Sequence, residues 1–425
     1  MIQKVQLFST KKDFLYFISA CGFILFYALL IEFNNYKNLT RFDSSIIEAT
    51  VLKQYEKTKL TKKNRLKTYQ VLKLKSKDGF TFYTTTKKTF PSSIGKKIKL
   101  EIWAGDISFY EYMTSFYAFS KTMDIYKTQT LKQKLNSFIT SKHENNNITH
   151  IYQALYTATP MPQNLQTTFS NLGVSHLLAI SGFHLGVLAM LLYFLFKLPY
   201  KYLQNRYFPY RSYKVDSFIF ISVILLGYLL FLDSPPSLLR SYAMLIIGFL
   251  LYDRGYKIIS MLTLVLTIFL LLSFFPRLVF SLGFWLSVSG VFYIFLFLIH
   301  FKKLNKIWQF ILLPFWVYLL MLPFSLVIFG NFSIYHPLSI IWTTLFSIFY
   351  PLSIVAHLIG YGNIFDNLLE VFIFFGKENI TIVLTQKWLI LHILLSLISI
   401  YKKRFIWALL FLNISIFVYA IYKLF

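Results

Sequence analysis

Two serines and two histidines lie close together in one short, otherwise apolar stretch of this chain. The stretch, SHLLAISGFHLG, holds in order Ser175, His176, Ser181, Gly182, His184 and Gly186. Ionisable groups inside an apolar segment are costly, and they usually face the interior of a helix bundle or water. In one continuous helix the two histidines would share a broad face, and the glycines would let another helix approach closely. These residues are therefore candidates for lining a pathway, with plain hydrogen bonding between helices as the alternative.

The pair Ser181 and His184 also has the residue types of a nucleophile and its base. Residues three apart are neighbours on a helix, so contact between the two is expected. Nucleophilic catalysis further needs a group that orients the base and donors that stabilise an oxyanion, and the sequence shows neither near this pair. An intramembrane hydrolase therefore stays an alternative, and we expect the chain not to be an enzyme.

Three further strings place small or charged residues beside apolar segments. In DSPPSLLRS the tandem proline predicts a helix start, with Arg240 in the first turns. A positive charge there is unfavourable to the helix dipole, so Arg240 either snorkels to phospholipid or supplies a fixed charge at an outer mouth. The strings FSLGFWLS and FGNFSIYHP add weaker pathway candidates, namely Ser281, Gly283, Ser287, Gly330 and Ser333.

Basic residues interleaved with aromatic ones indicate a second kind of chemistry. Residues 34–105 hold 17 Lys and Arg against 5 Asp and Glu, out of 43 and 17 in the whole chain. Basic grooves with aromatic platforms suit single nucleic acid strands. The alternative is that the aromatics form a core while the basic face rests on anionic lipid. The candidate nucleic-acid contacts are Lys57, Lys59, Lys62, Lys63, Arg65, Lys67, Lys73, Lys75, Tyr83, Lys87 and Lys88.

The composition fixes the class of scaffold that must position these residues. Of 425 residues, 56% are hydrophobic and only 14% are charged, whereas soluble domains are about 25% charged. The many phenylalanines and the few glycines and prolines exclude collagen-like and disordered chains. The chain is therefore predicted to be a polytopic α-helical membrane protein that carries some extramembrane mass.

Breaks in composition and period divide the chain into four regions. Residues 1–33 predict an uncleaved first membrane helix, and residues 44–105 predict a small barrel or sandwich of four or five strands. Residues 106–175 are expected to be an amphipathic connection, helical near Ser108–Met123 and Ile148–Leu172. Residues 176–425 predict a bundle with candidate spans at 176–197, 217–232, 238–252, 257–275, 279–301, 307–330, 337–360, 364–376, 388–401 and 404–422. The segments 238–252 and 364–376 are short, so a re-entrant segment is the alternative for each.

Basic residues near the spans assign an orientation. With a cytoplasmic N-terminus, thirteen of them fall in inside loops and five at outside ends, so residues 44–105 are expected outside the cytoplasm. The rule that positive residues stay in the cytoplasm holds only for short loops, and residues 34–105 are too long for it. Their net charge of +12 therefore needs another reason, and a polyanionic partner supplies one. The only cysteine, Cys21, lies in the first span, which excludes an intrachain disulfide and a thiolate metal site.

The quoted strings resemble the ComEC competence family, whose members carry DNA across the inner membrane during natural transformation. The resemblance rests on His176 to Gly186, Pro236 to Arg240, Ser281 to Ser287, and Phe329 to Ser333 with Pro337, in the family's order. It covers roughly residues 160–360, and residues 44–105 resemble the family's OB-like domain by position and pattern. It implies a polytopic helical channel with a small all-β OB-like extracytoplasmic domain inserted after the first transmembrane helix.

The resemblance also implies a function, passage of single-stranded DNA through the inner membrane to the cytoplasm. Many relatives end in a nuclease domain with an HxHxDH metal-binding string, which this sequence lacks, so we expect a short form without metal and a separate nuclease. No Walker-type loop is present, so no cofactor is expected and a cytoplasmic motor, a DNA-binding protein or the proton gradient must move the strand. A periplasmic DNA receptor and membrane lipid are the other expected partners. A small-solute transporter is a further alternative, weakened by the lack of an internal repeat.

Overall fold

The computed structural model describes residues 10–60, 66–126, 130–178, 180–255, 259–376, 380–382 and 384–423. These residues form two compact units. The first, here called the sheet unit, comprises Lys11–Ser141 and Phe269–Ser281; the second, the helical unit, comprises Lys142–Ile268 and Leu282–Phe425 within the described ranges. The basic segment and the SHLLAISGFHLG stretch therefore belong to different units.

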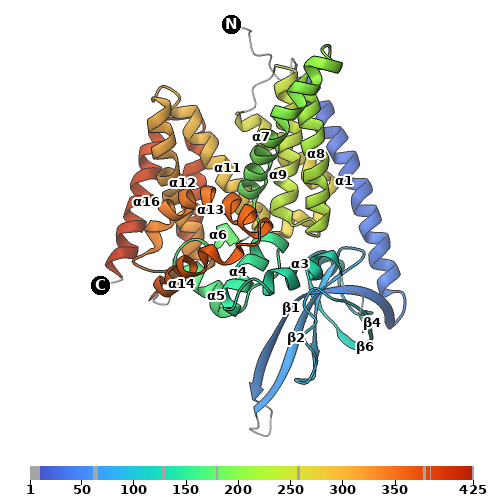
Figure 1. Ribbon diagram of the computed structural model, residues 1–425. Helices are drawn as coiled ribbons and strands as arrows, with labels where there is room; N and C mark the ends of the chain where they lie inside the picture. The colour runs from blue at the N-terminus through green and yellow to red at the C-terminus, as the bar shows by residue number, and fades with distance from the viewer. Residues whose placement is uncertain are drawn as a thin grey trace. The chain divides into compact units, whose positions relative to one another are not determined.

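The sheet unit begins with helix α1 (Lys11–Thr40), which is followed by a six-stranded sheet. The strands are β1 (Ser44–Leu60), β2 (Leu66–Ser76), β3 (Thr81–Thr86), β4 (Lys97–Trp103), β5 (Phe116–Tyr117) and β6 (Phe119–Ile125). They lie in the order β5-β3-β2-β1-β4-β6, with β1 and β2 as the long hairpin in Figure 1. A single residue separates β5 from β6, so one stretch of chain pairs in parallel with β3 and antiparallel with β4. The sheet thus curls into a half-barrel.

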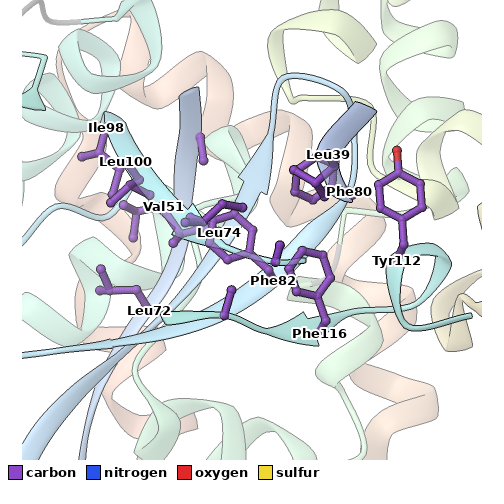
Figure 2. Packing of buried hydrophobic residues seen from close by; sticks show 14 of the residues in the cluster. Leu39, Val51, Leu72, Leu74, Phe80, Phe82, Ile98, Leu100, Tyr112 and Phe116 are labelled. Carbon is purple, nitrogen blue, oxygen red and sulfur yellow. The ribbon is translucent and has the colours of Figure 1, made fainter. Parts of the chain in front are cut away.

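The inner face of the half-barrel forms the core of the unit. Because side chains alternate across a strand, every second residue points inward, and Leu72, Phe82 and Leu100 have no exposed surface. Figure 2 shows these side chains converging with Leu39 from α1 and Tyr112 from helix α2 (Phe109–Met113). Some aromatic residues of the basic segment 34–105 therefore form the core. This agrees with one half of the alternative given above, in which the aromatics form a core and the basic face rests on lipid.

The sheet continues past residue 105, where the sequence had predicted it to end. A helix was expected across Ser108–Met123, but only α2 forms, held by a capping box in which the Ser108 side chain and Glu111 bond each other's backbone N–H groups. The rest is strand, because side chains of Phe119–Ile125 alternate in burial and the segment pairs with β4. Helix α3 (Leu131–Thr140) closes the unit. The range 44–105 by itself thus lacks two strands.

One partly buried ion pair fastens the second segment of this unit to the first. Arg277, in the turn η1 (Pro276–Phe280), donates from Nε and Nη2 to the carboxylate of Glu32, at 2.8 and 2.7 Å. The guanidinium also lies 4.6 Å from the ring centroid of Tyr112. This arginine is balanced by a carboxylate at close range, which distinguishes it from the arginine described below.

The helical unit consists of helices with short breaks between them. They are α4 (Asn146–Thr157), α5 (Gln163–Asn171), α6 (Ser175–Leu178), α7 (Gly182–Tyr207), α8 (Tyr213–Phe231), α9 (Pro236–Asp253), α10 (Met261–Phe274), which continues into the sheet unit, α11 (Leu282–His300), α12 (Lys306–Ile328), α13 (Ser339–Leu358), α14 (Asp366–Phe375), α15 (Gln386–Ser399) and α16 (Arg404–Tyr422). Turns η2 (His336–Leu338) and η3 (Gly362–Phe365) and a two-stranded pairing of β7 (Asn331–Phe332) with β8 (Ile380–Thr381) complete it.

Among the described helices, seven are long and apolar enough to cross a membrane, which makes this a multi-pass membrane protein. They are α1, α7, α8, α11, α12, α13 with η2, and α16. The sequence offered four more candidate segments, with a re-entrant segment as the alternative at 238–252 and 364–376. Helices α10 and α15 have 14 residues each and α14 has 10, fewer than the ~20 that cross a bilayer. Helix α9, with 18 residues, is also outside the seven.

The predicted helix over 176–197 is interrupted. Helix α6 ends at Leu178, Ser181 adopts an extended conformation with φ −129° and ψ 179°, and α7 begins at Gly182. His176 and His184 consequently do not lie on one helical face, whereas Gly182 and Gly186 both belong to α7. The interruption exposes a helix N-terminus in the middle of an apolar segment.

The segment between residues 143 and 178 packs along the whole of α13. In the loop before the helix, Ser333 Oγ donates to the Asn171 carbonyl at 2.8 Å. In the first turns of the helix, His176 Nε2 lies 3.2 Å from Thr343 Oγ1. At the other end, the ring nitrogens Nε2 of His143 and His357 are 3.0 Å apart. This polar segment, which was expected to be a separate connection, is part of the helical unit.

Candidate functional site

Ser181 and His184 form the N-terminal cap of α7. Ser181 Oγ accepts from the Phe183 N–H at 3.3 Å, and His184 Nδ1 accepts from the Ser181 N–H at 3.2 Å. These bonds satisfy orphan N–H groups of the first turn. Ser181 Oγ lies 3.3 Å from the same Nδ1, which already accepts the Ser181 N–H. A nucleophile's base must have its nitrogen free to take the hydroxyl proton, so the geometry explains the pair as a cap.

Gly182 allows helices α7 and α9 to meet at this cap. A Cβ on Gly182 would lie 2.4 Å from Ser241 Oγ and 3.4 Å from Arg240 Nη2, so no larger residue fits without displacement. Ser237, in the first turn of α9, donates from Oγ to the Ile180 carbonyl at 2.8 Å. A carbonyl left free by the helix break is thereby satisfied. The SGFH and PPSLLRS strings therefore build one structure.

Arg240 lies inside this structure with only 5% of its surface exposed, which rules out snorkelling to phospholipid. Its Nη2 donates to Ser287 Oγ at 2.5 Å and to Ser241 Oγ at 3.0 Å, and Nη1 to Met244 Sδ at 2.8 Å. In the described part of the chain no carboxylate lies within ion-pair distance of it, and its Nε has no partner there. A buried cation held only by neutral groups is costly, and an anion that reached it would be strongly favoured.

The N-terminus of α7 adds to the positive potential at Arg240. A helix N-terminus carries about half a positive charge, and its free N–H groups bind anions. In the same first turn of α7, the buried ring of His184 packs edge-on against Phe346 and Tyr350 at centroid distances of 5.3 and 4.8 Å. The arrangement suits a phosphate-bearing or similarly anionic ligand.

The remaining pathway candidates are dispersed. Ser175 begins α6, and His176 contacts Thr343. Ser333 is buried and bonded to a backbone carbonyl, which is a packing role. Gly330 adopts a φ of +69°, a conformation that favours glycine. A Cβ on Gly186 or Gly283 would meet open space, and Ser281 belongs to the sheet unit.

The second candidate site is the outer face of the sheet, where the register pairs lysines with tyrosines. Lys57 lies opposite Tyr69 and Lys59 opposite Lys67. Lys73 lies opposite Tyr83, with its Nζ 5.2 Å from the ring centroid. Lys75, on the same face, lies opposite Thr81. We call this surface, with Tyr55 and Tyr117, the lysine–tyrosine face.

The basic candidates differ in how they are placed. Lys57, Lys59 and Lys67 lie on a two-stranded ribbon, because these ends of β1 and β2 pair only with each other. Lys87 and Lys88 are exposed in the turn after β3. Lys62, Lys63 and Arg65 lie outside the described residues. The β4–β6 part of the outer face instead alternates in sign, with Glu48 opposite Lys99 and Glu101 opposite Lys121.

Sequence reasoning missed a cluster of histidines at the end of α13. His143, His357 and Asp366 are in contact although more than 200 residues separate the first from the other two. No local spacing could have signalled this contact, because each residue stands alone in its own segment. Within the described ranges no group of three His, Cys, Asp or Glu residues has the arrangement of a metal site.

The comparisons with known proteins bear on the helical unit. A family model described as Competence protein matches residues 157–425, more than half of the chain. The chain belongs to the competence protein family. The match confirms the resemblance to ComEC proteins and spans the α6–α7 break, Arg240 and Ser287, whereas the sheet lies outside it. Neither the curated proteins nor the solved structures gave a match. Competence family membership suggests a role in DNA uptake during competence.

The α7–α9 contact gives a first prediction for this competence protein. Gly182→Ala is expected to lower the free energy of unfolding by about 1–3 kcal/mol, because the new methyl group overlaps Ser241. Thermal unfolding of the purified protein in nanodiscs checks this. Gly186→Ala is the matched control, since it adds the same methyl group to the same helix in open space. Equal unfolding temperatures for the two variants would contradict the packing described here.

Proposed function

We propose that this chain is an inner-membrane channel that passes single-stranded DNA into the cytoplasm during natural transformation. The observation that carries the proposal is Arg240, a buried cation without a carboxylate partner among the described residues, in a chain whose family takes part in DNA uptake. A phosphodiester backbone is the anion that such a family would bring to it. Each passing phosphate would meet the guanidinium and the N-terminus of α7.

The sheet unit is proposed to bind the incoming strand, as an OB-like barrel. The topology supports this assignment: three consecutive antiparallel strands, a fourth that returns to β1, and a last stretch that closes against β3 and β4. OB-folds bind oligonucleotides on strands 2 and 3. Here those strands, β2 and β3, carry Lys73, Lys75 and Tyr83 on the lysine–tyrosine face. Lysines would contact phosphates and tyrosines would stack on bases.

The proposal extends to location and partners. The first span would place the sheet in the periplasm, where a DNA receptor delivers the strand and a separate nuclease removes its complement. A cytoplasmic motor or DNA-binding protein would draw the strand inward. Anionic lipid would contact the basic ends of the spans.

Uptake of labelled DNA into the cytoplasm tests the channel against a hydrolase. Ser181→Asn keeps a good N-cap but removes the hydroxyl nucleophile, and we expect it to retain uptake close to the wild-type level. Ser181→Ala loses the cap, which costs about 0.5–2 kcal/mol of stability, and should therefore be the less stable variant. The readout is fluorescent DNA protected inside cells that express each variant.

The outcomes separate the two mechanisms. Uptake lost in both variants, with Ser181→Asn folded as stably as the wild type, would favour a chemical role for the hydroxyl. A serine-directed covalent probe that labels the wild type and not Ser181→Asn would add to that conclusion. Periplasmic arrest of DNA in Arg240 variants supports the channel.

A further inference from the structure

The histidine cluster at the end of α13 forms a continuous buried hydrogen-bonded chain. Asp366 accepts from His143 Nδ1, with Oδ2 at 2.9 Å, and the Nε2 atoms of His143 and His357 are 3.0 Å apart. On its other side, His357 Nδ1 lies 2.7 Å from the Ser353 carbonyl oxygen and 3.2 Å from the Tyr156 hydroxyl. Both imidazoles are buried, with 7% and 5% of their surface exposed.

The two rings are held so that they cannot turn away from each other. His143 stacks on Tyr152 at a centroid distance of 4.5 Å, and His357 meets the edge of the same ring at 4.6 Å. A Cβ on Gly362 would lie 2.9 Å from the His357 ring, so the backbone of η3 closes the remaining side. The contacts between the ring nitrogens are therefore imposed by packing from α4, α13 and η3.

Counting donors shows how many protons this chain needs. Asp366 as a carboxylate and the Ser353 carbonyl only accept, so His143 Nδ1 and His357 Nδ1 must each carry a proton. One further proton must then lie between the two Nε2 atoms, since two facing lone pairs at 3.0 Å repel. Three protons on two imidazoles give one positive charge, which the carboxylate of Asp366 balances.

A distribution with only two protons leaves a repulsive contact. In one such distribution, the proton between the two Nε2 atoms stays and His357 Nδ1 has no proton. His357 Nδ1 can then accept a hydrogen bond from the Tyr156 hydroxyl. That nitrogen would then face the Ser353 carbonyl oxygen at 2.7 Å, so two acceptors would lie at hydrogen-bond distance.

The head-on geometry of the two Nε2 atoms also fits a shared proton better than a bridging metal. The ring centroids are 5.2 Å apart while the two Nε2 atoms are 3.0 Å apart, so the nitrogens lie between the two rings.

We propose that Asp366, His143 and His357 form a proton-binding site that clasps residues 143–156 to α13 and α14. We call this attachment of residues 143–156 to α13 and α14 the clasp; it depends on one proton shared between His143 and His357. Loss of that proton sets two lone pairs against each other, and gain of another sets two N–H groups against each other. The clasp is therefore strongest when the pair of rings holds that one proton, and it weakens at higher and at lower pH. The inference is independent of what the protein transports.

Other charged and titratable groups surround the site. Lys142 adjoins His143 in sequence, and Glu370 of α14 accepts from Asn145 Nδ2 at 2.7 Å. Tyr152 and Tyr156 of α4 are phenols whose pKa burial raises well above the usual range, so neither loses its proton between pH 5 and 9. The pH range in which the clasp holds thus depends on the two imidazoles and the carboxylate.

Asp366→Asn provides a sharp test, because an asparagine amide donates where the carboxylate accepts. With the amide donating to His143 Nδ1, the His143 Nε2–H can donate to His357 Nε2, and two neutral rings satisfy every contact. The measurement is hydrogen–deuterium exchange of the full chain in nanodiscs, for peptides covering 143–157, corrected for the intrinsic effect of pH. Wild-type protection should fall about 10–100-fold between pH 6.5 and pH 9, the cost of an unsatisfied buried group. Asp366→Asn should keep its protection at pH 9.

His150→Gln is the matched control, because it removes a histidine that lies within the measured peptides, in α4, but outside the chain of contacts. It should show the wild-type profile. Wild-type protection that does not change between pH 6.5 and pH 9 would overturn the proposal. An equal loss of protection at pH 9 in Asp366→Asn and the wild type would also overturn it.

A measurement on the wild type alone avoids the risk that a variant misfolds. In ¹⁵N-histidine NMR at pH 6.5, His143 and His357 should share one proton between their Nε2 atoms, and two neutral rings would refute it.

Discussion

Replacing Arg240 by methionine should make this competence protein more stable and nearly abolish DNA uptake. Methionine fills a similar volume and removes a buried cation without a carboxylate partner among the described residues, so the free energy of unfolding should rise by about 1–4 kcal/mol. A charge-assisted hydrogen bond to phosphate contributes about 1.5–3 kcal/mol, so uptake should fall about 10–100-fold. Thermal unfolding in nanodiscs and cytoplasmic uptake of labelled DNA measure the two effects.

Arg277→Met is the matched control for Arg240→Met. Arg277 is partly buried and is paired with Glu32. Its removal leaves a partly buried carboxylate unpaired, so the free energy of unfolding should fall by about 1–3 kcal/mol. The two substitutions should therefore shift stability in opposite directions. A loss of stability in both would mean that Arg240 has a structural counter-ion, and its proposed role would be withdrawn.

Neutralising three lysines of the ribbon should weaken binding of single-stranded DNA and its dependence on salt. In the variant Lys57→Gln, Lys59→Gln, Lys67→Gln, three exposed cations are removed beside Tyr55 and Tyr69. Each phosphate contact adds about 0.7 to the slope of log affinity against log salt, so the slope should fall by about 2.1. At 0.1 M salt this corresponds to a loss of roughly 100-fold. Fluorescence anisotropy of the full chain in nanodiscs measures it.

A second triple variant controls for net charge. Lys97→Gln, Lys99→Gln, Lys121→Gln removes the same charge from the β4–β6 part of the outer face, where the lysines alternate with Glu48, Glu101 and Asp124. These lysines are already compensated, so the affinity should change little. Equal losses in both variants would show that total charge, and not the lysine–tyrosine face, attracts the strand.

The sequence predicted the scaffold better than the site. Apolar run lengths located the long helices because a bilayer imposes a length on every span. Strand alternation located β1 to β4, but β5 and β6 were missed because their short segments pair with strands distant in the chain. The break before Gly182 escaped prediction because apolar residues flank it on both sides, and periodicity does not register a short interruption.

The meeting of distant residues was beyond the reach of sequence patterns. Ser181 and His184 have a spacing that fits both a catalytic pair and a helix cap, and only the bond from the Ser181 N–H to His184 Nδ1 favours the cap. Arg240 was recognised as unusual, but its burial depends on Ser287 of α11, which no local pattern connects to it. The contact of His143 with His357 is of the same kind.

The interrupted α6–α7 segment has a consequence for the energy supply of the cell. A conduit wide enough for a nucleic acid strand would also admit sodium, potassium and hydronium ions, and their leakage would discharge the membrane. Arg240 and the N-terminus of α7 place a fixed positive potential at one level of the bundle, and such a potential repels small cations. In the proposed channel, the groups that would attract the strand would thus also insulate the membrane while it passes.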